Sequence, residues 1–213
     1  TLANQFPSPV FIATEPGTSA MHAASVDVST WQDMKLVLDA LRKEKHSYKT
    51  VVLDTVDVAY TLCTTHVCES NGWVDVADGD FGRGWRAVDR EWTNMIAQLR
   101  SLPMCAIFIG HEKREEIVER MGSRDVATGR QRVSTALPRS ARSTLHAAMD
   151  FILRCELTDD NERLLRTQPV EGKRERIEAK ARGHKGAMLP DTLPMSFKEL
   201  HTAFKANFDK ETK

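Results

Sequence analysis

The segment TVVLD, residues 50–54, indicates the fold more clearly than any other part of the sequence. It is a short run of apolar, β-branched residues that ends in an acid, which is typical of a strand buried on both faces of a parallel sheet. Similar runs occupy residues 9–14 (PVFIAT) and 104–110 (MCAIFIG). Between these runs, apolar residues recur with helical spacing, as in residues 34–41 and 85–102. This alternation predicts an α/β fold with a mostly parallel sheet flanked by helices.

Further elements are expected on both sides of this core. Residues 150–157 and 163–167 alternate apolar and polar side chains around the turn residues TDDN, which predicts an antiparallel hairpin at the sheet edge. Two more helices are expected, over residues 56–69 and 196–208. No internal repeat or low-complexity linker interrupts the chain, so we expect one domain over residues 1–213.

Composition narrows the class of protein. Of the 213 residues, 41% are hydrophobic and 28% are charged, with a formal net charge of zero, which is the profile of a soluble globular protein. The acidic excess lies in the first hundred residues, and the matching basic excess lies in the remainder. Four scattered cysteines do not make a disulfide scaffold, and no apolar run reaches the roughly 20 residues of a membrane span. We therefore expect a cytoplasmic protein with no membrane partner.

Each of the three most apolar runs ends in, or is directly followed by, a residue with an ionisable side chain. These residues are Glu15, Asp54 and His111. In open α/β sheets, ligands bind outside the carboxyl ends of the strands, so we expect the three side chains at one edge. Asp54, followed by Thr55, resembles a carboxylate that holds Mg²⁺ beside a nucleotide, and Glu15 is a candidate general base. The open alternatives are a helix-capping Asp54, a solvated Glu15 before a turn, and a structural His111.

A phosphate-binding loop would complete such a site. None of the eleven glycines fits the pattern G-x-x-x-x-G-K-[ST]. Residues 1–6 nevertheless have the character of a first helix after such a loop, with Thr1 on the nucleotide side. We therefore expect the loop immediately upstream of Thr1.

A family resemblance is carried by six segments in a specific order: TLA-x-x-FP (1–7), VFI-x-TEPG (10–17), YKTVVLDTVD (48–57), GRGW (82–85), IFIGH (107–111) and LPDTLP (189–194). This order resembles the phage-type nucleotide-binding ATPases, small RecA-like members of the P-loop NTPase superfamily that include single-strand annealing recombinases. The resemblance implies a RecA-like core that binds ATP and Mg²⁺. It puts Asp54 in the Walker B position, Glu15 in the position of the catalytic glutamate, and His111 in the place of the sensor residue.

Two basic stretches are candidates for contacts with phosphates. Residues 120–142 hold six arginines and one acid, which is either a solvated face or, as the resemblance implies, a DNA-binding loop or hairpin. The candidate DNA-binding residues are Lys113, Arg114, Arg120, Arg124, Arg130, Arg132, Arg139 and Arg142. From the second stretch, residues 173–185, Lys180 and Arg182 are candidates for phosphate contacts across a subunit interface. Residues 72–84 are expected to form a mobile acidic loop, with Trp73 or Phe81 available to stack on bases.

The function expected from these features is ATP binding and hydrolysis by a RecA-like phage protein that acts on single-stranded DNA in recombination or replication. Such a protein would work as a homo-oligomeric ring or filament in the host cytoplasm. One alternative is a non-hydrolysing DNA-binding or annealing module with a degenerate P-loop fold. A third, less favoured alternative is a small-molecule nucleotide kinase with an arginine-rich lid.

Overall fold

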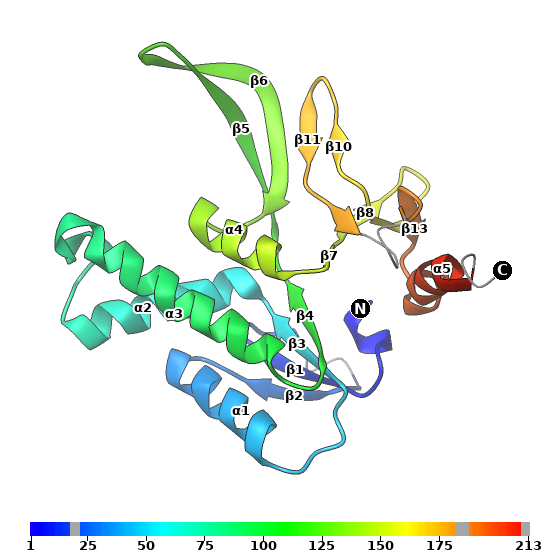
Figure 1. Ribbon diagram of the computed structural model, residues 1–213, viewed down its shortest axis with the longest axis horizontal. Coiled ribbons are helices and arrows are strands. Elements are labelled where there is room, and N and C mark those ends of the chain that lie inside the picture. Colours follow the sequence, from blue (N-terminus) through cyan, green and yellow to red (C-terminus); the bar gives the residue numbers. More distant parts are fainter. Residues whose placement is uncertain (18–21, 182–187, 210–213) are drawn as a thin grey trace. The chain divides into compact units, whose positions relative to one another are not determined.

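The computed structural model describes residues 1–17, 22–181 and 188–209, with the side chains of 207–209 left out (Figure 1). The chain divides into two compact units, where the sequence predicted one continuous domain. The first unit contains Ala3–His111 and Ala136–Ala148, and the second contains Glu112–Thr135 and the residues from Met149 onward.

A four-stranded parallel sheet forms the centre of the first unit. Its strands are β1 (Pro9–Ala13), β2 (Ala24–Asp27), β3 (Thr50–Asp54) and β4 (Cys105–Ile109), in the order β2-β1-β3-β4. β1, β3 and β4 confirm the three predicted strands. β2 was not predicted, because its four residues, ASVD, are only half-buried and lack a continuous apolar run.

Helices cover this sheet, and they begin where local signals favour them. Their bounds are α1 (Trp31–Lys43), α2 (Val56–Asn71), α3 (Arg83–Arg100) and α4 (Arg139–Ala148). Thr30 caps α1 by accepting a hydrogen bond from the backbone of Asp33, whose carboxylate accepts one from the backbone of Thr30 in return. The predicted apolar stripes of α1 and α3 are buried, except that Val37 is half-buried and Trp85 is 51% exposed.

Trp92 joins three of these helices. It is fully buried, its indole N–H donates to the carbonyl of Ala141 in α4 at 3.2 Å, and its ring meets Tyr60 of α2 edge-on. On the sheet, Ala3 packs against the buried residues Phe11 and Val52. Ala3 lies in a single 3-10 turn, η1 (Ala3–Gln5), so the helix expected over residues 1–6 is shorter than predicted.

The connection between α2 and α3 is a folded segment, and the expectation of a mobile loop is wrong. It contains two 3-10 turns, η3 (Val76–Asp78) and η4 (Asp80–Gly82). α2 ends at Gly72, whose φ of 67° is the left-handed conformation that glycine tolerates best. Asp75 then caps η3 in a reciprocal box with Asp78.

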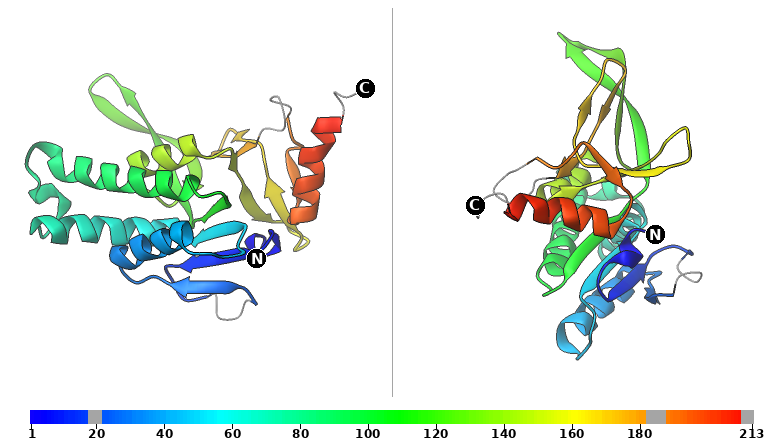
Figure 2. Two further views of the ribbon diagram at one scale, coloured as in Figure 1. Left: turned by 60° about the horizontal axis from the view of Figure 1, so that its bottom comes forward. Right: turned by 90° about the vertical axis from the view of Figure 1, so that its right-hand side faces the viewer.

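Two small sheets and a long hairpin make up most of the second unit (Figures 1 and 2). The hairpin strands are β5 (Glu112–Met121) and β6 (Arg124–Thr135). Together with β10 (Val170–Glu171) and β11 (Glu175–Ile177) they form a four-stranded sheet in the order β10-β11-β6-β5. A short pair joins β7 (Phe151–Ile152) to β12 (Lys180–Ala181), and α5 (Phe197–Asp209) follows the last strand.

The predicted 150–167 hairpin exists, but its expected place is wrong. β8 (Arg154–Leu157) and β9 (Arg163–Arg166) pair antiparallel and form a separate three-stranded sheet with β13 (Thr192–Pro194). They therefore do not extend the parallel sheet. Among the residues that the structure describes, no helix has both the length and the apolar character needed to cross a membrane.

Candidate functional site

Three neighbouring parallel strands end level with one another. The sheet register aligns Ala13 of β1, Asp54 of β3 and Ile109 of β4. The residues that follow these positions therefore emerge together at the carboxyl edge, as predicted. Thr14 joins two of the strand ends, because its hydroxyl accepts a hydrogen bond from the backbone N–H of Thr55 at 2.8 Å and donates one to the Thr55 carbonyl at 3.0 Å. The peptide bond between Asp54 and Thr55 is cis.

His111 is held by Asp57, a residue that the sequence reasoning missed. The backbone N–H of His111 donates to Oδ1 of Asp57 at 3.2 Å, and Nδ1 lies 2.8 Å from Oδ2. Asp57 lies in the first turn of α2, three residues after Asp54. The carboxylate at Nδ1 leaves Nε2 on the other side of the ring, 3.7 Å from Oε1 of Glu15. A detectable signal was the D-T-V-D spacing, which puts a second carboxylate just behind the strand end.

The ionisation of these groups follows from the same contacts. The hydrogen bond and negative charge of Asp57 raise the pKa of His111 above its ordinary 6.5. Burial opposes ionisation of Asp57, but the two hydrogen bonds from His111 outweigh it, so the pKa of Asp57 is lowered. Burial first, and the nearby charge of Glu15 second, raise the pKa of Asp54. The raised pKa of Asp54 means that its surroundings oppose a bare negative charge there, and a bound cation would compensate this charge.

The residues at Asp54 fit a magnesium ion. Carboxylate and hydroxyl oxygens are hard ligands, and the buried hydroxyl of Thr55 has no hydrogen-bond partner among the described residues. Within the same part of the chain, no three His, Cys, Asp or Glu side chains lie close enough to hold a metal ion by themselves. One carboxylate with water and phosphate oxygens as the other ligands is the usual arrangement for Mg²⁺ at nucleotides. Thr1, the remaining residue predicted to bind the nucleotide, is exposed and precedes η1.

The basic candidates are not one continuous patch. Four of the predicted DNA-binding residues form ion pairs with glutamates of the second unit: Lys113 with Glu115, Arg114 with Glu112 and Glu175, Arg130 with Glu171, and Arg132 with Glu178. Arg139 and Arg142 lie in α4 of the first unit, where Arg142 is buried away from any surface that a DNA backbone could contact.

Arg120 and Arg124 differ from these paired residues. Both lie beside the turn of the β5–β6 hairpin, where Met121 pairs with Arg124, and both are exposed. Among the described residues, neither Arg120 nor Arg124 forms an ion pair, whereas the other cations of the hairpin do. Of the second basic stretch, Lys180 donates to the carbonyl of Met149 at 2.6 Å, and Arg182 lies outside the described residues.

Comparisons with known proteins identify the family of the chain. The family described as an AAA domain matches residues 1–182. Over 109 residues, the chain is 29% identical to the SPbeta prophage-derived uncharacterized protein YorG of Bacillus subtilis (strain 168). That alignment covers 48% of this chain and 34% of the relative, so the chain spans about a third of the relative's length. Because the family match extends over most of the sequence and the parallel α/β core is the one that such domains have, the chain belongs to the AAA domain family of P-loop NTPases.

Proposed function

We propose that this chain contributes the carboxyl edge of its parallel sheet to the hydrolysis of a nucleoside triphosphate, ATP in the first place. The observation that carries the proposal is the convergence of Glu15, Asp54 and the Asp57-bound His111 at aligned strand ends. Two acids with different environments and a fixed imidazole are suited to phosphoryl transfer to water. Membership of the P-loop NTPase family supports the same reaction class.

Each residue has a separate role in this proposal. Asp54 holds Mg²⁺, which when bound neutralises charge on the phosphates. Glu15 orients the attacking water and accepts its proton. His111, with Nδ1 occupied by Asp57, presents Nε2 toward Glu15 and would supply a hydrogen bond to a phosphate bound there. Asp57 is a positioning residue, because it acts only through the orientation of the imidazole.

Hydrolysis is tested by the release of inorganic phosphate from ATP by the full-length protein. We expect release with Mg²⁺ and none above the uncatalysed rate when EDTA replaces it. The control is the same preparation after heat denaturation. Phosphate release that persists after heating would come from a contaminating enzyme. If no phosphate is released while oligothymidine is still bound, hydrolysis is refuted and the non-hydrolysing DNA-binding module becomes the better description.

We further propose that the protein acts on single-stranded DNA through the β5–β6 hairpin. The support is the pair of exposed cations Arg120 and Arg124 at its turn, on strands whose other cations are neutralised by glutamates. Cations that contact the DNA backbone give binding without sequence preference. The prophage origin of the relative is compatible with a role in phage recombination or replication.

The double variant Arg120→Gln/Arg124→Gln tests this contact. Each phosphate neutralised on a single strand contributes about −0.7 to the slope of log affinity against log salt, so the variant should reduce the slope by about 1.4. The measurement is fluorescence anisotropy with labelled oligothymidine over a salt series. Arg163→Gln/Lys198→Gln is the control, because both residues are exposed cations of the second unit but lie outside the hairpin and outside the second basic stretch. Equal slopes for the test and control variants would refute the hairpin as the DNA contact.

A further inference from the structure

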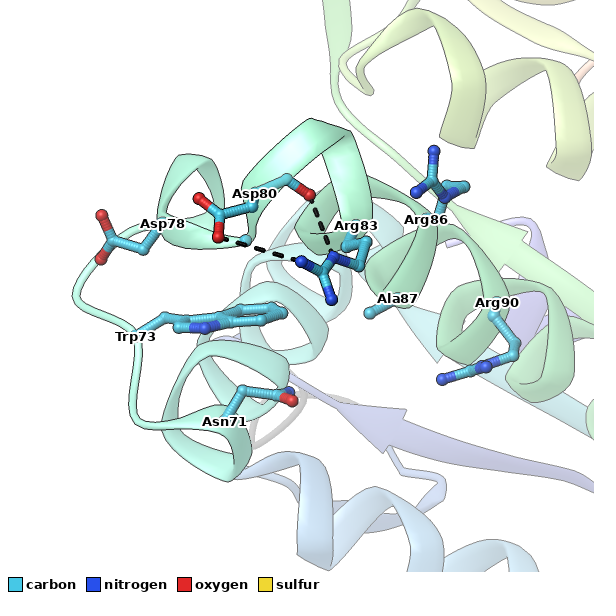
Figure 3. A pocket seen from close by; sticks show the side chains of 9 residues that line it. Asn71, Trp73, Asp78, Asp80, Arg83, Arg86, Ala87 and Arg90 are labelled. Atoms are coloured by element: carbon cyan, nitrogen blue, oxygen red, sulfur yellow. Dashed lines mark hydrogen bonds and ion pairs between the residues drawn. The ribbon is translucent and has the colours of Figure 1, made fainter.

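A second site lies in the first unit, away from the strand ends. It is a hollow of about 520 Å³ beside the first half of α3 (Figure 3). Its lining residues are Asn71, Trp73, Asp78, Gly79, Asp80, Arg83, Arg86, Ala87 and Arg90. None of them belongs to the site formed by Glu15, Asp54 and His111.

The hollow has a basic side and an aromatic side. Arg83, Arg86 and Arg90 are three and four residues apart, so they lie along one side of α3. Between them, Ala87 has only a methyl group, which leaves room for a ligand. Trp73 comes from the segment after α2 and faces this space from the other side (Figure 3).

Close backbone packing fixes the position of Trp73. Its backbone N–H donates to the carbonyl of Cys68 at 2.9 Å. A Cβ atom on Gly79 would overlap the backbone of Gly84 and lie 3.0 Å from the Trp73 ring, and a Cβ on Gly84 would overlap the carbonyl of Val76. Glycine at both positions therefore lets the segment pack directly on the start of α3. The aromatic side of the hollow is preformed.

The lining keeps a net positive charge that is available to a ligand. Asp78 uses its carboxylate to accept hydrogen bonds from the backbone N–H groups of Val74 and Asp75. Asp80 faces Arg83, with its carboxylate 3.9 Å and its carbonyl 3.3 Å from the guanidinium. Arg86 and Arg90 are exposed, and neither has an ion pair or hydrogen bond among the described residues.

We propose that this hollow binds one nucleotide unit, with its phosphate on Arg86 and Arg90 and its base stacked on Trp73. Guanidinium groups match phosphate oxygens in pairs, and aromatic rings stack on bases of any sequence. The volume lies within the roughly 300–1,000 Å³ of small-molecule sites. The same chemistry is offered by a free nucleotide and by one residue of a single strand. The site needs no metal ion and is independent of the proposed hydrolysis at Asp54.

The test compares two substitutions that line the hollow with one at the other end of the same helix, outside the hollow. Arg90→Gln removes a phosphate contact, and Ala87→Leu fills the hollow without changing charge. Arg100→Gln is the matched control, because Arg100 is an exposed arginine at the end of the same helix. Binding is measured in EDTA, so that Mg²⁺ does not contribute, by calorimetry with thymidine monophosphate and by anisotropy with labelled oligothymidine. The oligothymidine arm is repeated in the Arg120→Gln/Arg124→Gln protein, which removes the hairpin contact.

Arg90→Gln should weaken binding about tenfold, the effect of losing one charged hydrogen bond. Ala87→Leu should weaken it at least as much, because the larger side chain occupies the space of the ligand, and Arg100→Gln should leave it unchanged. Weaker binding of the mononucleotide by these variants identifies a free nucleotide as the ligand. Weaker binding of oligothymidine alone identifies one residue of a single strand as the ligand. Unchanged affinity of Arg90→Gln for both probes overturns the proposal, since Arg90 is exposed and its substitution should not alter the fold. Asp54→Asn should not affect this binding, so failure of the hydrolysis proposal would be seen separately.

Discussion

Glu15→Gln is expected to reduce phosphate release by about 10²- to 10⁴-fold, which is the usual contribution of a positioned general base. The amide keeps the size of the side chain but cannot accept a proton from the attacking water. Affinity for Mg-ATP should remain close to that of the parent protein, because Glu15 is assigned no contact with the metal. The two measurements are single-turnover phosphate release and equilibrium binding of a fluorescent ATP analogue.

Glu44→Gln is the matched control for this variant. Glu44 is an exposed glutamate at the end of α1, in the same unit, and its substitution should change neither rate nor affinity. A Glu15→Gln protein with the parent's rate would return Glu15 to the solvated turn position considered from the sequence. A protein that lost nucleotide affinity as well would show that Glu15 binds the metal or the phosphates, which contradicts its assignment as a base.

The parallel core could be predicted because its determinants are local. Strands buried on both faces need uninterrupted apolar residues, and residues 51–53 of β3 satisfy this requirement alone. β4 has the same kind of apolar run, although it lies at the sheet edge and is mostly half-buried. Once parallel strands are inferred, their ends must share one edge, so the meeting of Glu15 with His111 follows from topology. No side-chain geometry was needed for that step.

The features that were missed depend on contacts between residues far apart in the sequence. Asp57 has the local appearance of an acid in the first turn of a helix, and only β4 brings His111 to it. Arg130 and Arg132 belong to a basic run, yet strands from residues 170–178 bring glutamates that neutralise them. Charge counted along the chain therefore overestimated the positive surface. In the segment after α2, acidic residues suggested mobility, whereas their carboxylates cap its turns.

Asp54→Asn is expected to slow Mg-dependent hydrolysis strongly and yet to raise the melting temperature. Loss of the magnesium ligand removes several kcal/mol of transition-state stabilisation, or a rate decrease of about 10³-fold. The stability effect has the opposite sign because burial and Glu15 raise the pKa of Asp54 above its ordinary 3.8. For a carboxyl group with a raised pKa, the folded state disfavours the ionised form. The resulting loss of folding stability is fully present above the folded pKa and vanishes below the ordinary pKa. Asparagine is uncharged and avoids this cost at neutral pH.

Asp57→Asn, three residues away, is the matched control and should lower the melting temperature. The pKa of Asp57 is lowered, so its stabilisation is present above 3.8 and lost as pH falls through the folded pKa. The pKa of His111 is raised, so its share is present below 6.5 and lost as pH rises through the folded value. The pair thus contributes most between these limits, and calorimetry at about pH 6 should detect it. Because His111 is 58% exposed, the decrease should be small. If both asparagine variants shift the melting temperature in the same direction, the opposite environments assigned to the two aspartates are wrong.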